Sequence, residues 1–314
     1  MRKGEFELID SIRSMFTVPS GVMGIGDDCA VIPQQSGLET VVSTDMLMEG
    51  AHFLMEDVEP YQLGWKSAAV NISDIAAMGG SPSGSFLAFS LPASLPDGWV
   101  GEFMRGYADI SREYGFPLLG GDTTGSPDRL CICVTVMGQC PLGRSVKRSG
   151  AKAGDLICVT GNLGDSGAGL EVILKGLDRE NEDNRYLVDR HYLPRPRLAE
   201  GISLMQAGVS SMMDISDGIG SDLRHIMEES HVGAVVETEA LPISAQLARF
   251  CESRGLDPLK FAVGGGEDYE LLFTADPQTE SSLTVPHTVI GRIVEGSQLE
   301  LRGCNGNYSG FTHF

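Results

Sequence analysis

Along the first half of this chain, segments in which apolar residues recur at helical spacing alternate with segments that have the composition of strands. Apolar side chains at helical spacing predict an amphipathic helix over residues 6–16, before the break at Pro19-Ser20-Gly21. Short β-branched or apolar runs bounded by turn residues predict strands over 40–44 and 86–91. Between these strands, residues 61–78 have a helical pattern that ends at two glycines.

The alternation of strands and helices continues to residue 274. A long helix over 99–114 and a strand over 130–137 complete a first α/β unit. A basic, glycine-containing segment then precedes further predicted elements: a strand over 155–160, a helix around 168–175, a polar loop over 178–184, a strand–turn–helix segment over 212–229 and a strand over 269–274. We therefore predict an α/β (α+β) fold with mixed sheets flanked by helices, in two domains, 1–147 and 148–314.

The charge balance narrows the class of ligand. The 314 residues include 23 Lys and Arg against 43 Asp and Glu, a formal charge of −20. This charge repels a nucleic-acid backbone or an anionic membrane, so we expect neither as a partner and favour a small ligand. A phosphorylated ligand stays compatible with an acidic protein if divalent cations lie between carboxylates and phosphates.

The cysteines and the lack of long apolar segments both indicate the cellular compartment of the protein. Seven cysteines, an odd number without a Cys-x-x-Cys pair, favour a reducing compartment. The amino-terminal residues lack the apolar core of a secretory signal, and no segment approaches the roughly 20 apolar residues of a membrane span. We expect a cytoplasmic protein.

Aspartates in glycine-flanked or strand-end positions are the strongest chemical feature. Taken singly, each has an ordinary explanation as a turn former or helix cap. Several nevertheless follow predicted strands, where α/β folds build ligand sites, and Asp74 lies on an otherwise apolar helix beside Asn71. The set is Asp27, Asp28, Asp45, Asp74, Asp122, Asp214 and Asp217.

Dispersed aspartates fit Mg²⁺, which prefers oxygen ligands and is held by a few carboxylates together with substrate phosphates. The His and Cys spacing of zinc sites is absent, as are the phosphate loop of P-loop enzymes and the catalytic loop of protein kinases. If the aspartates converge, their repulsion persists until cations enter, so metal and nucleotide are expected to bind together.

Other segments leave two interpretations open. The glycines of 161–169 either cradle phosphate at a helix start or make a tight structural turn, which we favour. Arg148 is either a phosphate contact or part of a solvated linker, whereas Arg195 and Arg197 indicate a helix start. The glycines before Glu267 and Asp268 favour close backbone approach to a ligand, with either acid facing a cationic substrate.

The order of these motifs resembles the thiamine-monophosphate kinase family over nearly the whole chain. The matching pieces are Gly-Ile-Gly-Asp-Asp-Cys-Ala (24–30), Ser-Thr-Asp-Met-Leu (43–47) with His52, Ala-Val-Asn-Ile-Ser-Asp-Ile-Ala-Ala-Met-Gly (69–79), Gly-Gly-Asp-Thr-Thr (120–124), Arg-Ser-Gly-Ala-Lys-Ala-Gly-Asp (148–155), Asp-Ile-Ser-Asp-Gly (214–218) and Gly-Gly-Glu-Asp-Tyr-Glu-Leu (265–271). Seven motifs in the family's order make coincidence implausible.

This resemblance implies a fold like that of aminoimidazole ribonucleotide synthetase and a homodimer formed through the amino-terminal domains. It also implies transfer of the ATP γ-phosphoryl group to thiamine phosphate, with several Mg²⁺ ions and no separate catalytic acid or base. The implied metal ligands are Asp28, Ser43, Thr44, Asp45, Asp74, Asp122, Asp214 and Asp217. The implied nucleotide contacts are Tyr114, Gly121, Asp122, Arg148 and Ser216, and the implied substrate contacts are His52, Glu267 and Phe311.

Two alternatives remain beside this assignment. One is another ATP-dependent enzyme of the same fold, such as aminoimidazole ribonucleotide synthetase. Selenophosphate synthetases need an amino-terminal Cys or selenocysteine, and the hydrogenase-maturation enzymes end in a reactive Cys, whereas this chain begins Met1-Arg2-Lys3 and ends Thr312-His313-Phe314. The other alternative is a non-catalytic sensor of nucleotide or metal that has kept the aspartates.

Overall fold

The first sheet is built by the amino-terminal half of the chain. The computed structural model describes residues 21, 23, 27–33 and 37–303. Five strands pair in the order β1-β2-β5-β3-β4, and only the β3–β4 pair is parallel, because helix α3 crosses over between these two strands. The strands are β1 (Ala30–Pro33), β2 (Leu38–Met48), β3 (Ser81–Pro92), β4 (Leu118–Ser126) and β5 (Cys131–Pro141).

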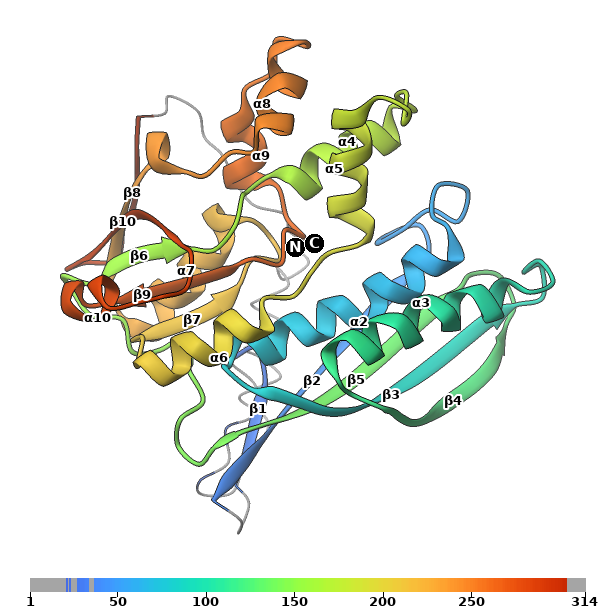
Figure 1. Ribbon diagram of the computed structural model, residues 1–314, viewed down its shortest axis with the longest axis horizontal. Coiled ribbons are helices and arrows are strands. Elements are labelled where there is room, and N and C mark those ends of the chain that lie inside the picture. The colour runs from blue at the N-terminus through green and yellow to red at the C-terminus, as the bar shows by residue number, and fades with distance from the viewer. Residues whose placement is uncertain (1–20, 22, 24–26, 34–36, 304–314) are drawn as a thin grey trace, which may run out of the picture.

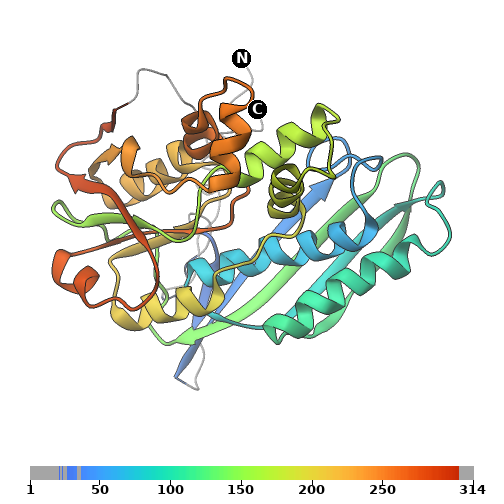
Figure 2. The same ribbon diagram turned by 45° about the horizontal axis from the view of Figure 1, so that its top comes forward.

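Two helices, α2 (Pro60–Ala77) and α3 (Trp99–Tyr114), cover the same face of this sheet (Figures 1 and 2). Glycines let them cross closely: a Cβ on Gly64 would lie 1.9 Å from the Phe103 carbonyl oxygen, and one on Gly106 would lie 1.9 Å from that of Tyr61. No described helix covers the opposite face of the sheet, where Met46 is 54% exposed.

The second sheet lies in the carboxyl-terminal half, with its strands in the order β11-β8-β10-β6-β9-β7. Only β11 and β8 are parallel neighbours. One face packs on α7 and α9, and the other packs on α6 and the end of α2. The strands are β6 (Leu156–Val159), β7 (Ser211–Asp214), β8 (Gly233–Glu237), β9 (Leu271–Ala275), β10 (Thr288–Val294) and β11 (Leu299–Arg302).

The remaining helices surround the second sheet and close over α2 (Figure 1). They are α4 (Asp165–Leu174), α5 (Glu182–Tyr192), α6 (Leu198–Ala207), α7 (Ile219–Ser230), η1 (Thr238–Ala240), α8 (Ala245–Glu252), α9 (Pro258–Gly264) and α10 (Pro277–Ser281). None of the described helices combines the length and apolar content needed to cross a bilayer.

Helix α2 connects the two halves of the molecule. Helix α6 packs so closely on α2 that a Cβ on Gly201 would lie 2.1 Å from the Ala76 carbonyl oxygen. At its other end, the Trp65 indole N–H donates to the Pro194 carbonyl over 2.8 Å. Residues on nearly every side of α2 are therefore buried, which explains its largely apolar sequence.

Most predicted elements agree with the structure, with three corrections. The strand predicted to end at residue 44 continues to Met48 because β2 pairs with β5 along its full length, so Asp45 lies within a strand. Asp122 also lies within a strand, β4, which the sequence pattern did not predict. The polar loop over 178–184 ends early, because Asn181 caps α5. The predicted helix over 6–16 lies outside the described residues.

The predicted domain boundary, between residues 147 and 148, falls in the segment that joins β5 to β6. Each sheet lies entirely on one side of it. The division into domains 1–147 and 148–314 stays a prediction.

Candidate active site

Three aspartates from distant parts of the chain meet between the two sheets. Asp28 lies just before β1, Asp74 lies in the last turn of α2, and Asp214 is the last residue of β7. One carboxylate oxygen of each lies within 4.8 Å of the others, a spacing that suits a bound metal ion. We call these three residues the aspartate cluster.

Strand alternation decides which residues of β2 reach the aspartate cluster. Ser43 lies on the face toward α2, where its hydroxyl donates a hydrogen bond to Asp74. Asp45, two residues on, is on the same face. Thr44 is on the opposite face, and its hydroxyl lies 2.9 Å from the hydroxyl of Thr135 and donates to the Val134 carbonyl. The side chain of Thr44 therefore does not join the cluster.

Burial and neighbouring carboxylates raise the pKa of two aspartates of the cluster and of Asp45 beside it. Burial and then the charge of Asp28 raise the pKa of Asp214 to about 7 and that of Asp45 to about 6. Burial and then Asp45 raise the pKa of Asp74 well above its usual value. Such shifts mark a group of like charges held together without enough positive charge to balance them.

Arg148 is the cation that the structure places at the cluster. Its guanidinium donates to Asp28, and its backbone N–H donates to Asp27 over 3.1 Å. Burial would lower the pKa of Arg148, but Asp28 and Asp27 hold it above its usual range. Its Nε atom is buried and makes no hydrogen bond to the described residues. Arg148 thus belongs to the site and is not part of a solvated linker.

The donor set fits Mg²⁺. One oxygen of Asp28, Oδ2, is buried and accepts no hydrogen bond from the described residues. Buried carboxylate oxygens without donors are rare, and a hard cation satisfies them. Asp28, Asp45, Asp74 and Asp214 are therefore the residues best placed to hold the metal.

Two supporting residues were missed by the sequence analysis. The Ser73 hydroxyl donates to Asp214 over 2.6 Å and so fixes that carboxylate from the neighbouring helix. Asp222 is buried, and it accepts a hydrogen bond from the backbone N–H of Asp217 over 3.2 Å. The half-buried Asp217 lies in the loop before α7, whose N-cap is Gly218, and outside the group of three.

Glu267 lies in a second loop that packs against the 214–218 loop. Its backbone N–H donates to the Ser216 carbonyl over 2.7 Å, so a predicted nucleotide contact and a predicted substrate contact are neighbours. Burial would raise the pKa of Glu267, but Lys66 and His191 outweigh it, and the pKa is lowered. His52 contributes in the same direction, and its Nδ1 accepts a hydrogen bond from the backbone N–H of Met48 over 3.1 Å.

Tyr269 is a buried residue two positions after Glu267. Burial, then Glu267 and Asp45, raise the pKa of its phenol well above the usual value. Its backbone has a φ of 51°, a left-handed conformation that a non-glycine residue adopts only when its surroundings enforce it. The sequence analysis did not identify Tyr269, although it lies inside one of the quoted motifs.

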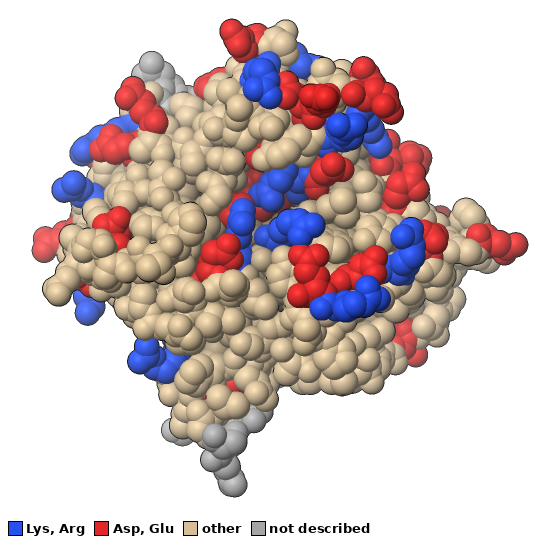
Figure 3. All heavy atoms as spheres, in the orientation of Figure 1, with Lys and Arg blue, Asp and Glu red and all other residues tan. Residues whose placement is uncertain are grey.

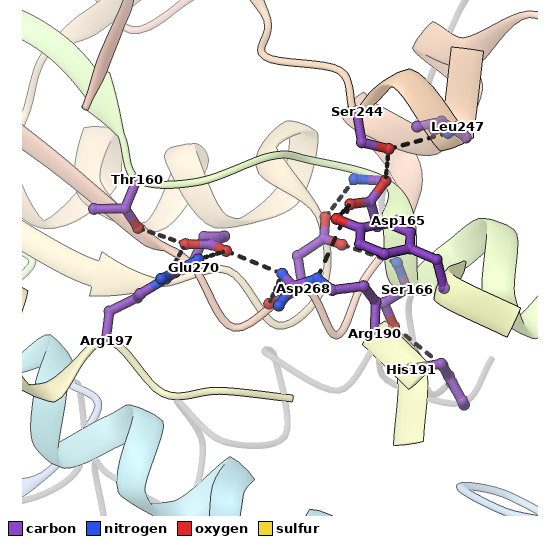
Figure 4. A network of polar contacts seen from close by, with 12 residues as sticks. Thr160, Asp165, Ser166, Arg190, His191, Arg197, Ser244, Leu247, Asp268 and Glu270 are labelled. Carbon is purple, nitrogen blue, oxygen red and sulfur yellow. Dashed lines mark hydrogen bonds and ion pairs between the residues drawn. The ribbon is translucent and has the colours of Figure 1, made fainter. Parts of the chain in front are cut away.

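The glycine-rich segment 161–169 is a structural turn. Asp268 accepts hydrogen bonds from the backbone N–H groups of Gly164 (2.6 Å) and Ser166 (3.1 Å), where α4 begins (Figure 4). The amides that would cradle a phosphate are therefore occupied by a carboxylate of the protein itself. Asp268 is correspondingly buried and does not face a ligand.

Three predicted residues lie away from the aspartate cluster. Gly121 shares a row of the first sheet with Asp45, but β5 and β3 separate their strands, which places them roughly 14 Å apart. Asp122, one residue further along the exposed strand β4, is on the same sheet face as Thr44. Tyr114 ends α3, near Arg195 and Arg197. Their assigned roles stay predictions, and Phe311 lies outside the described residues.

Comparisons with known proteins agree with this arrangement. Residues 26–140 match the family described as AIR synthase related protein, N-terminal domain, and residues 152–303 match the corresponding C-terminal domain. A thiamine-monophosphate kinase of Escherichia coli strain K12 is 41% identical over 93% of this chain and 91% of its own length.

Two further matches extend over the full chain. A thiamine-monophosphate kinase of Aquifex aeolicus is 36% identical over 99% of this chain and 98% of its own length. A solved structure described as "AaThiL complexed with AMPPCP and TMP" superposes with a TM-score of 0.92 at 34% identity, covering 100% of this chain and 99% of the other. The chain therefore belongs to the AIR synthase related proteins and, within them, to the thiamine-monophosphate kinase family.

Proposed function

We propose that this chain transfers the γ-phosphoryl group of ATP to thiamine phosphate, giving thiamine diphosphate and ADP. The observation that carries the proposal is the aspartate cluster, in which three carboxylate oxygens lie within 4.8 Å of one another. The proposal is also supported by relatives named thiamine-monophosphate kinases and by a similar structure that holds AMPPCP, an unreactive ATP analogue, together with TMP.

The reaction needs alignment and charge neutralisation more than a strong base. A phosphate monoester with a second pKa near 6 is largely a dianion at neutral pH, so its oxygen attacks without losing a proton to the protein. That oxygen forms a bond to the γ-phosphorus while the bond to the β–γ bridging oxygen breaks, and ADP leaves with the electron pair. No phosphorylated enzyme is formed.

Asp28, Asp45, Asp74 and Asp214 would hold Mg²⁺, which supplies positive charge to neutralise the phosphates. Ser43 and Ser73 orient two of these carboxylates, and Arg148 adds a guanidinium at the same place. The phosphate end of each ligand belongs at this cluster. Gly121, Asp122, Tyr114 and Ser216 remain the proposed nucleotide contacts.

The thiamine end of the substrate belongs near Glu267 and His52. Thiamine carries a cationic thiazolium ring, and the Glu267 carboxylate stays ionised because the charge of Lys66 lowers its pKa against the effect of burial. The backbone of Glu267 bonds to Ser216, two residues after Asp214, so both ends of one ligand can be held at the same time. Phe311 is proposed as a ring contact.

A homodimer is part of the proposal. The face of the first sheet that α2 and α3 leave uncovered carries Met46, Met48 and Phe86, each at least 40% exposed. Helix α3 carries exposed charges of both signs, with Arg105 paired to Glu102, whereas the surface below it in this view, at the edge of the sheet, is almost free of charged side chains (Figure 3). An apolar patch of this kind favours contact with a second copy. We also propose the cytoplasm, where ATP is supplied.

Product analysis tests the function directly. Purified protein is incubated with ATP, Mg²⁺ and thiamine phosphate, and the products are separated; we expect thiamine diphosphate and ADP in equal amounts. Unphosphorylated thiamine is the control and should yield neither. Failure to form thiamine diphosphate would sink the proposal in favour of another enzyme of the fold or a nucleotide sensor.

A labelled γ-phosphate tests the mechanism separately. In direct transfer, label appears in thiamine diphosphate and never on the protein. Covalent label on the chain after denaturation would point to a phosphoenzyme instead.

A further inference from the structure

Lys66 is a fully buried lysine in the apolar helix α2. Its ammonium group donates to Oε2 of Glu267 over 3.0 Å and lies 3.1 Å from Nε2 of His191. It also lies 5.8 Å from the centre of the Tyr192 ring, within the range of a cation–π contact. Burying an ammonium group is costly unless it is fully paired, and these three partners come from two different segments of the chain.

The neighbouring imidazole is fixed at both nitrogens. Burial and the charge of Lys66 lower the pKa of His191 to about 3, so the ring is neutral. Its Nε2 must then accept from Lys66, which puts the ring proton on Nδ1, and Nδ1 donates to the Ser166 hydroxyl over 3.0 Å (Figure 4). A ring held in this way leaves Lys66 little freedom to move.

The Glu267 carboxylate is held at one oxygen only. Lys66 bonds to Oε2, and no hydrogen bond from the described residues reaches Oε1. The side chain is 28% exposed, and the backbone has a φ of 64°, a left-handed conformation fixed by the bond to Ser216. Lys66 and the backbone thus determine how Oε1 is presented to a ligand.

We propose that Lys66, supported by His191, is a positioning residue that fixes the Glu267 carboxylate for the cationic end of thiamine phosphate. The proposal rests on the proposed function, because it concerns how that substrate is recognised. Lys66 touches no reacting atom and acts only through Glu267. Its loss therefore weakens binding of one substrate and leaves phosphoryl transfer intact.

The substitution Lys66→Met, which keeps the length of the side chain and removes its charge, tests this role. We expect the Kd and KM for thiamine phosphate to rise about 10- to 100-fold, the range of a charged hydrogen bond, while kcat and the KM for ATP stay unchanged. Binding is followed by calorimetry with thiamine phosphate, independently of turnover.

The double variant separates positioning from simple support of the fold. If Lys66 acts through Glu267, then Lys66→Met adds no further loss to Glu267→Gln. Additive losses, or an unchanged Kd in the single variant, would overturn the inference. Should Lys66→Met fail to fold, His191→Phe takes its place with an expected loss of about tenfold, and His191→Gln, which restores an acceptor, should recover part of it.

A matched control is available on the same helix as His191. Arg190→Met also removes a cation from a glutamate, in this case the buried Glu270, which lies outside the site. It should lower thermal stability without changing the Kd for thiamine phosphate. If the parent chain neither binds nor turns over thiamine phosphate, the proposed function fails and this inference with it; an active parent with a normal Lys66→Met variant removes the inference alone.

Discussion

Two buried polar centres of this molecule both combine carboxylates with arginine, but they differ in how completely the carboxylates are hydrogen-bonded. At the first, the fully buried Glu270 accepts from Arg197 at both of its oxygens (2.6 Å each), from Arg190 (2.9 Å) and from Thr160 (2.7 Å) (Figure 4). At the second, the aspartate cluster, Asp28 and its neighbours share Arg148, and a buried oxygen of Asp28 receives no hydrogen bond from the part of the chain that the structure describes.

The difference lies in charge balance. Around Glu270 every acceptor site is filled by the protein, so the network is complete and supports the packing of β9 against α5 and α6. At the aspartate cluster the carboxylates outnumber the guanidinium group, and burial together with their mutual repulsion raises the pKa values of Asp45, Asp74 and Asp214. A carboxylate whose acceptor sites are all filled by the protein stabilises the fold, whereas carboxylates that lack donors are suited to bind a cation.

The largest expected effect is on catalysis at the aspartate cluster. We expect Asp45→Asn to reduce kcat by roughly 10³-fold, because a metal ligand is lost where charge is neutralised. The melting temperature should stay the same or rise, because a buried carboxylate that raises its neighbours' pKa is removed. Kinetics and calorimetry on one preparation measure both, and near-normal turnover would refute the assigned role.

The opposite outcome is expected at the complete network. Glu270→Gln removes the buried counter-charge of two partly buried guanidinium groups, which should lower the free energy of unfolding by about 3 to 5 kcal/mol. Urea unfolding measures the loss. Arg249→Ala, which breaks an exposed pair with Asp183, is the control and should change little. A Glu270→Gln protein as stable as its parent would contradict the comparison.

Cation binding should stabilise the folded protein through the aspartate cluster and not through the network around Glu270. Mg²⁺ with AMPPCP at about 100 times its Kd should add about 2.7 kcal/mol to the folded state, seen as a higher melting temperature that a chelator reverses. Glu270→Gln should keep this increment and Asp45→Asn should lose most of it. An equal increment in both variants would place the cation elsewhere.

The smallest effect is expected from a residue that touches no ligand. Ser73→Ala removes the hydrogen bond that orients Asp214, and we expect about tenfold weaker Mg²⁺ binding. Ser67→Ala is the matched control on α2, because the Ser67 hydroxyl donates only to the Leu63 carbonyl of its own helix. If Ser67→Ala weakens Mg²⁺ binding as much as Ser73→Ala does, the lost orientation of Asp214 does not explain the weaker binding.

The sequence predicted the site best where one residue contradicts its local pattern. Asp74 was found because a carboxylate on an apolar helix needs a reason. Lys66 has the same property eight residues earlier on that helix, and the same reasoning would have found it. By contrast, Glu270 follows two other acids before a strand, and nothing local reveals that Arg190 and Arg197 fold onto it.

Strand limits were predicted less well, for a physical reason. The pattern at Thr40–Thr44 ends where polar residues begin, yet β2 continues because its hydrogen-bond partner β5 does. Likewise β4 is exposed along nearly all of its length and carries glycines, so it has no apolar alternation to detect. Pairing with β3 alone makes it a strand.

Helix α2 carries both the lysine behind Glu267 and Asp74 of the aspartate cluster. These residues are eight apart, and a helix rises about 1.5 Å per residue, so their Cα atoms are separated by roughly 12 Å along its axis. A helix enclosed on nearly all sides cannot bend to change this separation. The fold therefore keeps Lys66, and with it the Glu267 carboxylate that it positions, at a constant distance from Asp74.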